Sequence, residues 1–167
     1  MGARATFDHG FGPFYDMDSR ILILGSFPSV KSRAASFYYG HPQNRFWKVM
    51  AAIAGETAPV TLPDKQAFLR RNHIALYDVI QSCSIEGSSD SSIADVVVTD
   101  LRPVLAGSSV GMRIYTNGGK AHELYMKYQY PQLGIEAIRL PSTSPANAAM
   151  SLDRLIAAWS ARIGSLE

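Results

Sequence analysis

Two polar segments of the chain carry side chains that could take part in chemistry. The first runs from Tyr38 to Trp47 and contains His41 and Asn44. The second runs from Leu140 to Asn147 and places three adjacent hydroxyl residues between two prolines. A neutral asparagine amide can orient a water molecule, and hydroxyls in a loop stiffened by prolines are ready ligands for phosphates. The two segments therefore indicate a site that binds a phosphate-containing ligand and positions a water molecule.

Three consecutive aromatic residues, Phe37, Tyr38 and Tyr39, stand beside the first segment. An aromatic ring can stack on a nucleobase, which contributes about 1–3 kcal/mol per base. Aromatic residues also dominate protein cores, so packing is an equally good interpretation for each of the three. We expect Tyr39 to be the one that is partly exposed to a pocket.

Each polar candidate also has a structural interpretation. Asn44 stands at the start of a predicted helix, where asparagine is a favoured N-cap. His41 precedes a proline and could serve only to cap a turn. Asp78 ends a predicted strand, where it could likewise cap a turn. Asn117-Gly118 could belong to a phosphate-cradling turn or to an ordinary strand-to-helix connection.

The elements that must position these residues alternate along the chain. Short apolar runs predict four strands, at Arg20–Gly25, Ile74–Ile80, Met112–Thr116 and Ile135–Leu140. Apolar residues at helical spacing or helix-start signals predict helices at Asn44–Ala54, Asp64–Asn72, Asp100–Ala106, Gly119–Tyr128 and Ser151–Ile163. This alternation predicts an α/β fold with three layers, α/β/α, around a central, mainly parallel four-stranded sheet. Ligands of such sheets bind beyond the carboxyl ends of the strands, where both polar segments lie.

Composition narrows the class of protein. The 167 residues are 47% hydrophobic and 18% charged, which suits a single domain over residues 1–167 with a real core. The net charge is only +2, so contacts with nucleic acid would depend on local patches. One cysteine, Cys83, fits a metal-free protein of a reducing compartment. The N-terminus lacks a signal-peptide core and the longest apolar run, Val49 to Ala54, is short, so we expect a cytoplasmic monomer that does not enter membranes.

The two polar segments resemble the signature motifs of the uracil-DNA glycosylase superfamily. The run from His41 to Trp47 is similar to the His-Pro-x-Asn-x-Phe-Trp motif of the mismatch-specific and hypoxanthine branches, and the second segment follows in the same chain order. Gly25-Ser26-Phe27-Pro28, followed by Tyr38-Tyr39, resembles the hypoxanthine (deoxyinosine) branch. The resemblance covers about Ile21 to Trp159, which is the span of a whole domain.

The resemblance implies a monofunctional DNA glycosylase of base excision repair. Such an enzyme flips a deaminated base, here expected to be hypoxanthine in deoxyinosine, out of DNA and hydrolyses its N-glycosidic bond. The partner would be DNA containing a deaminated base, with no cofactor and no metal. No lysine lies between His41 and Trp47 to act as a Schiff-base nucleophile, so an intact abasic site is the expected product.

One departure from the mismatch branch assigns the catalytic residue. That branch uses an asparagine in its first motif to position the attacking water, and Phe27 occupies this place here. The resemblance to the hypoxanthine branch implies that Asn44 takes the catalytic role.

The resemblance also implies which residues bind the ligand. Phe27, Tyr39, His41 and Asp78 are the expected base-binding residues, and Ser29, Ser142, Thr143 and Ser144 are the expected phosphate ligands. Asp78 stands where several superfamily members carry asparagine. Its carboxylate could accept a hydrogen bond from N1–H of hypoxanthine, so a backbone N–H or Gln81 would have to donate to O6.

Other functions compete with this one. The same fold could act on uracil or on mismatched bases, although Phe27 argues against efficient uracil excision. A catalytically silent α/β module that binds a nucleotide or a partner is the alternative from a different class, and the presence of Asn44, Ser142 and Ser144 argues against it. A cysteine hydrolase is the weakest alternative, because Cys83 lacks a recognisable Cys-His spacing.

Overall fold

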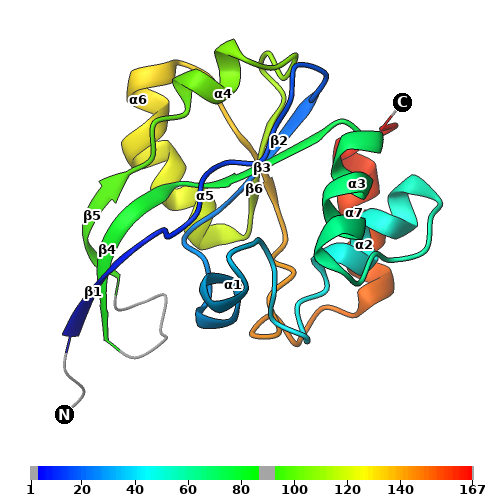
Figure 1. The fold of residues 1–167 in the computed structure, drawn as a ribbon, viewed down its shortest axis with the longest axis horizontal. Helices are drawn as coiled ribbons and strands as arrows, with labels where there is room; N and C mark the ends of the chain where they lie inside the picture. The colour runs from blue at the N-terminus through cyan, green and yellow to red at the C-terminus, as the bar shows by residue number, and fades with distance from the viewer. Residues whose placement is uncertain (1–3, 87–92, 167) are drawn as a thin grey trace.

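Four parallel strands form the central sheet of the protein. The computed structural model describes residues 4–86 and 93–166, and Figure 1 shows its ribbon. The strands are β2 (Ile21–Gly25), β3 (Ile74–Asp78), β6 (Ile114–Asn117) and β7 (Ile138–Leu140). They lie in the order β3-β2-β6-β7, and every neighbouring pair is parallel. The predicted four-stranded parallel sheet is therefore confirmed.

Helices cover both faces of this sheet, which explains why its central strand is apolar throughout. Every residue of β2 is buried, as expected for a strand that is covered on both sides. Figure 1 shows α2 (Phe46–Ala54), α3 (Leu62–Arg71) and α7 (Leu152–Ile163) on one side. On the other side lie α4 (Arg102–Ala106), α5 (Gly119–Leu124), a π-helical turn (Tyr125–Gln129) and α6 (Tyr130–Leu133). The three predicted layers are present.

Local signals fix the ends of the longer helices. Thr61 caps α3 and Ser151 caps α7, and each side chain accepts a backbone N–H three residues further on. Gly55 ends α2 in a left-handed conformation with φ of 70°. Trp159, fully buried in α7, donates from its indole N–H to the carbonyl of Pro141 at 2.8 Å, so the last helix also holds the start of the second polar segment.

A second, antiparallel sheet was not predicted. It consists of β1 (Arg4–Asp8), β4 (Ile80–Glu86) and β5 (Ala94–Val98) in the order β1-β4-β5. The predicted strand Ile74–Ile80 in fact ends at Asp78, and β4 begins two residues later in the other sheet. Polar residues interrupt these strands, and β5 pairs with β4 through register shifts. The sequences of β4 and β5 therefore lack the regular alternation of apolar and polar residues that predicts a strand.

A short helix, α1 (Val30–Ala35), was also absent from the prediction. Ser29 is its N-cap and accepts the backbone N–H of Ser32 at 3.1 Å. Figure 1 shows α1 at the end of the molecule toward which the parallel strands run, together with the loops before α2 and before α7. Among the residues that the structure describes, no helix has the length and apolarity needed to cross a membrane.

Candidate functional site

A cavity of about 680 Å³ lies at the carboxyl ends of the parallel strands, within the usual volume range of small-molecule sites. From the first half of the chain, the predicted site residues that line it are Phe27, Ser29, Tyr39, His41 and Asn44. Asp78, also in the first half of the chain, lines the cavity as well, and the second half contributes Ser142, Thr143 and Ser144. All nine predicted residues therefore meet at one place, although they come from three separate loops and from the end of β3.

Two hydrogen bonds fix the side chain of Asn44. Its Oδ1 accepts the backbone N–H of Phe46 at 2.9 Å and the hydroxyl of Thr143 at 2.8 Å. The first of these bonds satisfies the N–H of the first residue of α2. The N-cap position itself is Arg45, so Asn44 is not the predicted N-cap but supports the start of the helix from the preceding residue. Because both bonds within the described chain end on Oδ1, the amide Nδ2 group is left to donate in the cavity. A structural role of Asn44 at the start of α2 and a catalytic role are thus compatible.

Thr143 is itself held by Asn117, the last residue of β6. Asn117 Nδ2 donates to the Thr143 hydroxyl at 3.0 Å, and the Thr143 N–H donates to Asn117 Oδ1 at 3.1 Å. The Thr143 side chain is fully buried. The predicted phosphate contact of Thr143 does not fit this geometry, because its hydroxyl and N–H already have side-chain partners and neither is exposed.

Arg45 joins the two polar segments through hydrogen bonds. Its backbone N–H donates to the carbonyl of Thr143 at 3.0 Å. Its guanidinium donates to the carbonyls of Ser144 at 3.2 Å, of Asn147 at 2.9 Å and of Met150. One side chain thus satisfies two carbonyls of the second segment and one shortly after it, and holds the segment against the start of α2.

Ser142 and Ser144 form successive turns at the cavity wall. The Ser142 hydroxyl accepts the N–H of Ser144 at 3.1 Å, and the Ser144 hydroxyl accepts the N–H of Ala146 at 3.2 Å. Both serines are partly exposed, so their hydroxyl hydrogens are available to a ligand. Gly118 approaches this wall closely, since a Cβ there would lie 3.1 Å from Ser142 Cβ. The Asn117-Gly118 turn therefore supports the second segment from behind.

Asp78 forms the buried floor of the cavity. Only 4% of its surface is exposed, and its Oδ2 lies 2.7 Å from Nε2 of His9, which is fully buried. A Cβ on Gly25 would overlap Asp78 Oδ1, so the absence of a side chain at Gly25 makes room for this oxygen. Asp78 is therefore not a turn cap: its carboxylate contacts His9 and faces the end of β2.

Tyr39 contributes its hydroxyl, rather than a free ring face, to the same floor. Its ring stacks on Phe46 with centroids 4.0 Å apart, and its backbone is left-handed with φ of 53°. The hydroxyl is buried, has no hydrogen-bond partner among the described residues and lies 3.5 Å from the position of a Cβ on Gly25. Burial, and then the charge of Asp78, raise the pKa of Tyr39, so the hydroxyl remains a neutral donor.

The remaining predicted residues lie around the opening. His41 Nδ1 accepts the N–H of Gln43 at 3.0 Å, which caps a turn and leaves the proton on Nε2. Phe27 is half-buried beneath the guanidinium of Arg33, 5.3 Å from its ring centroid. Ser29 is exposed, and its hydroxyl, besides capping α1, donates to the hydroxyl of Ser32 at 3.1 Å.

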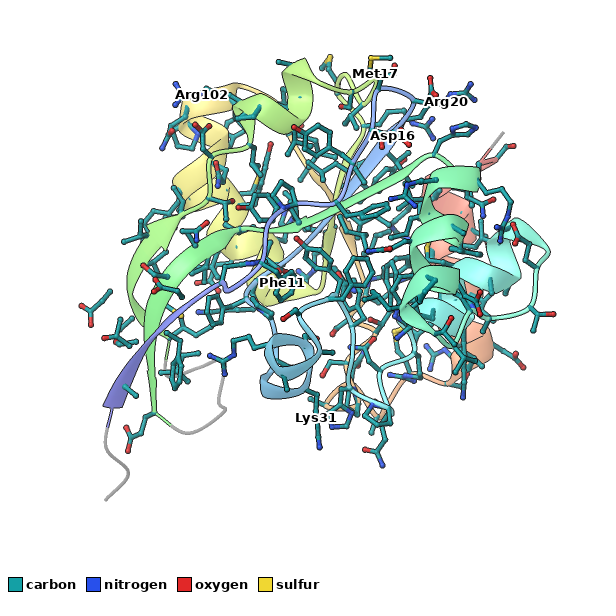
Figure 2. The ribbon with its side chains drawn as sticks, viewed as in Figure 1. Phe11, Asp16, Met17, Arg20, Lys31 and Arg102 are labelled. Carbon is teal, nitrogen blue, oxygen red and sulfur yellow. The ribbon has the colours of Figure 1, made fainter. Side chains whose placement is uncertain are left out.

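Several residues that line the cavity or lie behind its floor were not predicted from the sequence. His9 lies far from both polar segments in the sequence, and no motif marks it. Arg33 and Lys31 belong to the unpredicted helix α1, and Lys31 projects from its outer side in Figure 2. Gln81, considered as a donor to O6, accepts a hydrogen bond from the Tyr77 hydroxyl and is not among the lining residues. Within the described ranges, no three His, Cys, Asp or Glu side chains gather closely enough to hold a metal ion.

Known proteins resemble this chain over most of its length. The sequence profile of the Uracil DNA glycosylase superfamily matches residues 12–161. A hypoxanthine DNA glycosylase of Methanosarcina acetivorans is 36% identical over 146 residues, which cover 87% of this chain and 91% of that protein. A hypoxanthine DNA glycosylase of Methanosarcina barkeri is 33% identical over 139 residues, which cover 83% and 87%.

The fold has a solved counterpart as well. A solution NMR structure from Methanosarcina acetivorans, provisionally described as a uracil DNA glycosylase, matches with a TM-score of 0.75 and 35% identity. The match covers 91% of this chain and 93% of that one. With the parallel sheet and the two loops at its carboxyl edge, these matches show that the chain belongs to the uracil DNA glycosylase superfamily.

Proposed function

We propose that this protein is a DNA glycosylase that hydrolyses the N-glycosidic bond of hypoxanthine in deoxyinosine and leaves an intact abasic site. The names of its relatives from Methanosarcina support this substrate. The observation that carries the proposal is the placement of Asn44, Tyr39 and Asp78 around one cavity, where an amide, a hydroxyl donor and a buried carboxylate all face the space for a ligand.

The floor of the cavity matches one edge of hypoxanthine. That edge offers an N1–H donor beside the O6 acceptor, which is the pattern of a lactam. Asp78 Oδ1 would accept from N1–H, and the unpartnered Tyr39 hydroxyl would donate to O6. Adenine presents the reverse pattern, an acceptor at N1 and a donor at N6, and would leave both protein groups unpaired. A buried polar group without a partner costs about 1–3 kcal/mol, so adenine should be rejected.

Asn44 would position the attacking water. Cleavage of the glycosidic bond passes through a sugar that resembles an oxocarbenium ion, which reacts with neutral water when the water is correctly placed. Since Oδ1 of Asn44 is held by Phe46 and Thr143, the water contact falls to Nδ2, which would donate to the water oxygen. Asn44 would thus orient the water without removing its proton.

The residues around the opening of the cavity, which form its rim, would bind the backbone of DNA. We assign phosphate contacts to Ser142 and Ser144, whose hydroxyl hydrogens are available, and to exposed Ser29 if its hydroxyl turns away from Ser32. His41, which carries its proton on Nε2, and half-buried Phe27 would contact the flipped nucleotide at the opening. The protein would act as a monomer, without a cofactor or a metal.

The experiment that tests this function is a substrate panel. Purified protein is incubated with duplexes that carry one hypoxanthine, uracil, xanthine or thymine mismatch, and strand cleavage is measured with and without alkali. We expect hypoxanthine to be released fastest and cleavage to require alkali. Uracil shares the lactam edge, so equal or faster release of uracil would move the protein to another branch of the superfamily. Cleavage without alkali would contradict simple hydrolysis.

A further inference from the structure

A buried histidine lies behind the floor of the cavity. His9 follows β1 and is fixed there by its backbone N–H, which donates to the carbonyl of Gln81 at 2.7 Å. Its side chain is fully buried. Nε2 faces Asp78 Oδ2 at 2.7 Å, and Nδ1 contacts the carbonyl oxygen of Phe11. His9 therefore has an oxygen at each of its two ring nitrogens.

These two contacts determine where the protons lie. A carbonyl oxygen can only accept, so Nδ1 of His9 must carry a proton. A single further proton then lies between Nε2 and Asp78 Oδ2. Whether it resides on His9 or on Asp78, the pair as a whole is neutral and the other carboxyl oxygen, Oδ1, remains an acceptor. Burial of the pair thus avoids the large cost of an isolated buried charge.

Aromatic rings hold the imidazole in this orientation. The ring of Phe11 lies 4.5 Å from that of His9, Tyr77 5.2 Å and Tyr38 5.9 Å, measured between centroids. Figure 2 shows Phe11 between β1 and α1, and its side chain is partly buried against the core. With His9 confined in this way, Asp78 Oδ2 is always engaged, and Oδ1 is the oxygen that faces Gly25 and the cavity.

We propose that His9 is a positioning residue that keeps Asp78 Oδ1 an acceptor and thereby selects bases with an imino N–H over bases with a ring-nitrogen acceptor. The inference rests on the proposed function, since it names the group that enforces its preference for hypoxanthine. Without His9, a proton needed to neutralise buried Asp78 can sit on Oδ1, and the acceptor then becomes a donor that faces N1–H.

The test is base preference in binding, which a purely structural role would not change. Wild-type protein and variants are titrated with duplexes that contain 2′-fluoro-deoxyinosine or 2′-fluoro-deoxyadenosine, which resist hydrolysis, and with undamaged duplex. His9→Phe keeps an aromatic ring but loses both polar contacts. We expect it to lower the preference for the deoxyinosine analogue about tenfold, with unchanged affinity for undamaged DNA. His9→Gln, whose amide can donate to Asp78, should retain most of the preference.

Two further variants allow the role of His9 to be tested even if His9→Phe folds poorly. In Asp78→Asn, the new amide can donate to Nε2 of neutral His9 and leave its oxygen toward the cavity, so the preference should survive. His122→Phe removes a histidine that hydrogen-bonds Thr116 outside the cavity lining, and should change nothing in base preference.

The two proposals fail in different ways. If the wild-type protein releases hypoxanthine but His9→Phe, folded by its melting curve, keeps the full preference, the role of His9 is overturned and the function stands. If His9→Phe cannot be purified, loss of preference in both His9→Gln and Asp78→Asn overturns it. If the wild-type protein releases no hypoxanthine in the substrate panel, both proposals fall.

Discussion

The Thr143 hydroxyl donates to Asn44 Oδ1 at 2.8 Å, across 99 positions of sequence. Asn117 donates to the same hydroxyl, so the proton of Thr143 can only be directed at Asn44. The last residue of β6 therefore sets the orientation of an amide on the opposite wall of the cavity. This chain of hydrogen bonds, like the contacts of Arg45, joins the two segments that resemble the superfamily motifs.

Removal of this hydroxyl should slow catalysis. Thr143→Val keeps the shape of the side chain but leaves Asn117 Nδ2 without its acceptor and frees the Asn44 amide to turn. We expect the single-turnover rate of hypoxanthine release to fall about tenfold, and the free energy of unfolding by about 1–3 kcal/mol. Thr143→Ser, which restores the hydroxyl, should recover most of the rate. Wild-type excision by Thr143→Val would show that the bond does not position Asn44.

A methyl group at Gly25 should impair base recognition. It would overlap Asp78 Oδ1 and lie 3.5 Å from the Tyr39 hydroxyl, while the Gly25 backbone itself does not require glycine. Gly25→Ala should therefore fold but release hypoxanthine at least tenfold more slowly under single-turnover conditions. Gly12→Ala is the matched control, because a Cβ there meets nothing within 4 Å. Equal rates for the two variants would remove Asp78 and Tyr39 from base binding.

Removal of the serine hydroxyls at the rim should weaken DNA binding more than it slows release of the base. Ser142→Ala and Ser144→Ala each remove one neutral hydroxyl, which contributes about 1 kcal/mol to a phosphate contact. We expect affinity for substrate duplex to fall about fivefold for each variant, with the rate of the bound complex nearly unchanged. Titration of DNA binding and single-turnover rates at saturating enzyme separate these effects. A lower rate at saturation, with affinity intact, would assign these serines to catalysis instead.

Alkaline conditions should destabilise the protein through buried tyrosines. Burial, and then the charge of Asp78, raise the pKa of Tyr39 above its ordinary value of about 10. Its contribution to stability is complete below about pH 10 and is lost as the pH rises further, because the unfolded chain ionises first. Denaturant unfolding between pH 8 and pH 11 should show this decline, and Tyr39→Phe should make it shallower. The same slope in both proteins would contradict burial of the hydroxyl.

Much of the fold was predictable because its signals are local. The aliphatic run at β2 has no polar alternation, which identifies a strand covered on both faces. Ser151 and the apolar stripe through Leu155 and Trp159 mark α7. Asn44 and the serines belong to loops that follow predicted strands. The sequence therefore predicts that they lie at the carboxyl edge of the sheet, where the cavity is found.

The remaining features depend on contacts between distant segments. His9 contacts Asp78 across 69 positions, and no pattern around His9 indicates a partner. In the sheet β1-β4-β5, the short edge strand β5 is partly exposed, and its pairing with β4 overrides a weak local preference. Thr143 looked like its neighbouring serines in the sequence, and only the position of Asn117 separates its role from theirs.

The most direct test of the account is the single-turnover release of hypoxanthine by Asn44→Ala, measured with DNA affinity and a melting curve. Loss of a preorganised polar group at a developing charge typically costs about 10²–10³ in rate, whereas loss of a helix cap costs about 1 kcal/mol of stability. We predict a rate loss of about 10²–10³ in a variant that still folds and binds DNA. Near-normal excision by Asn44→Ala, or a loss explained entirely by melting, would contradict the account and leave Asn44 with only a structural role at the start of α2.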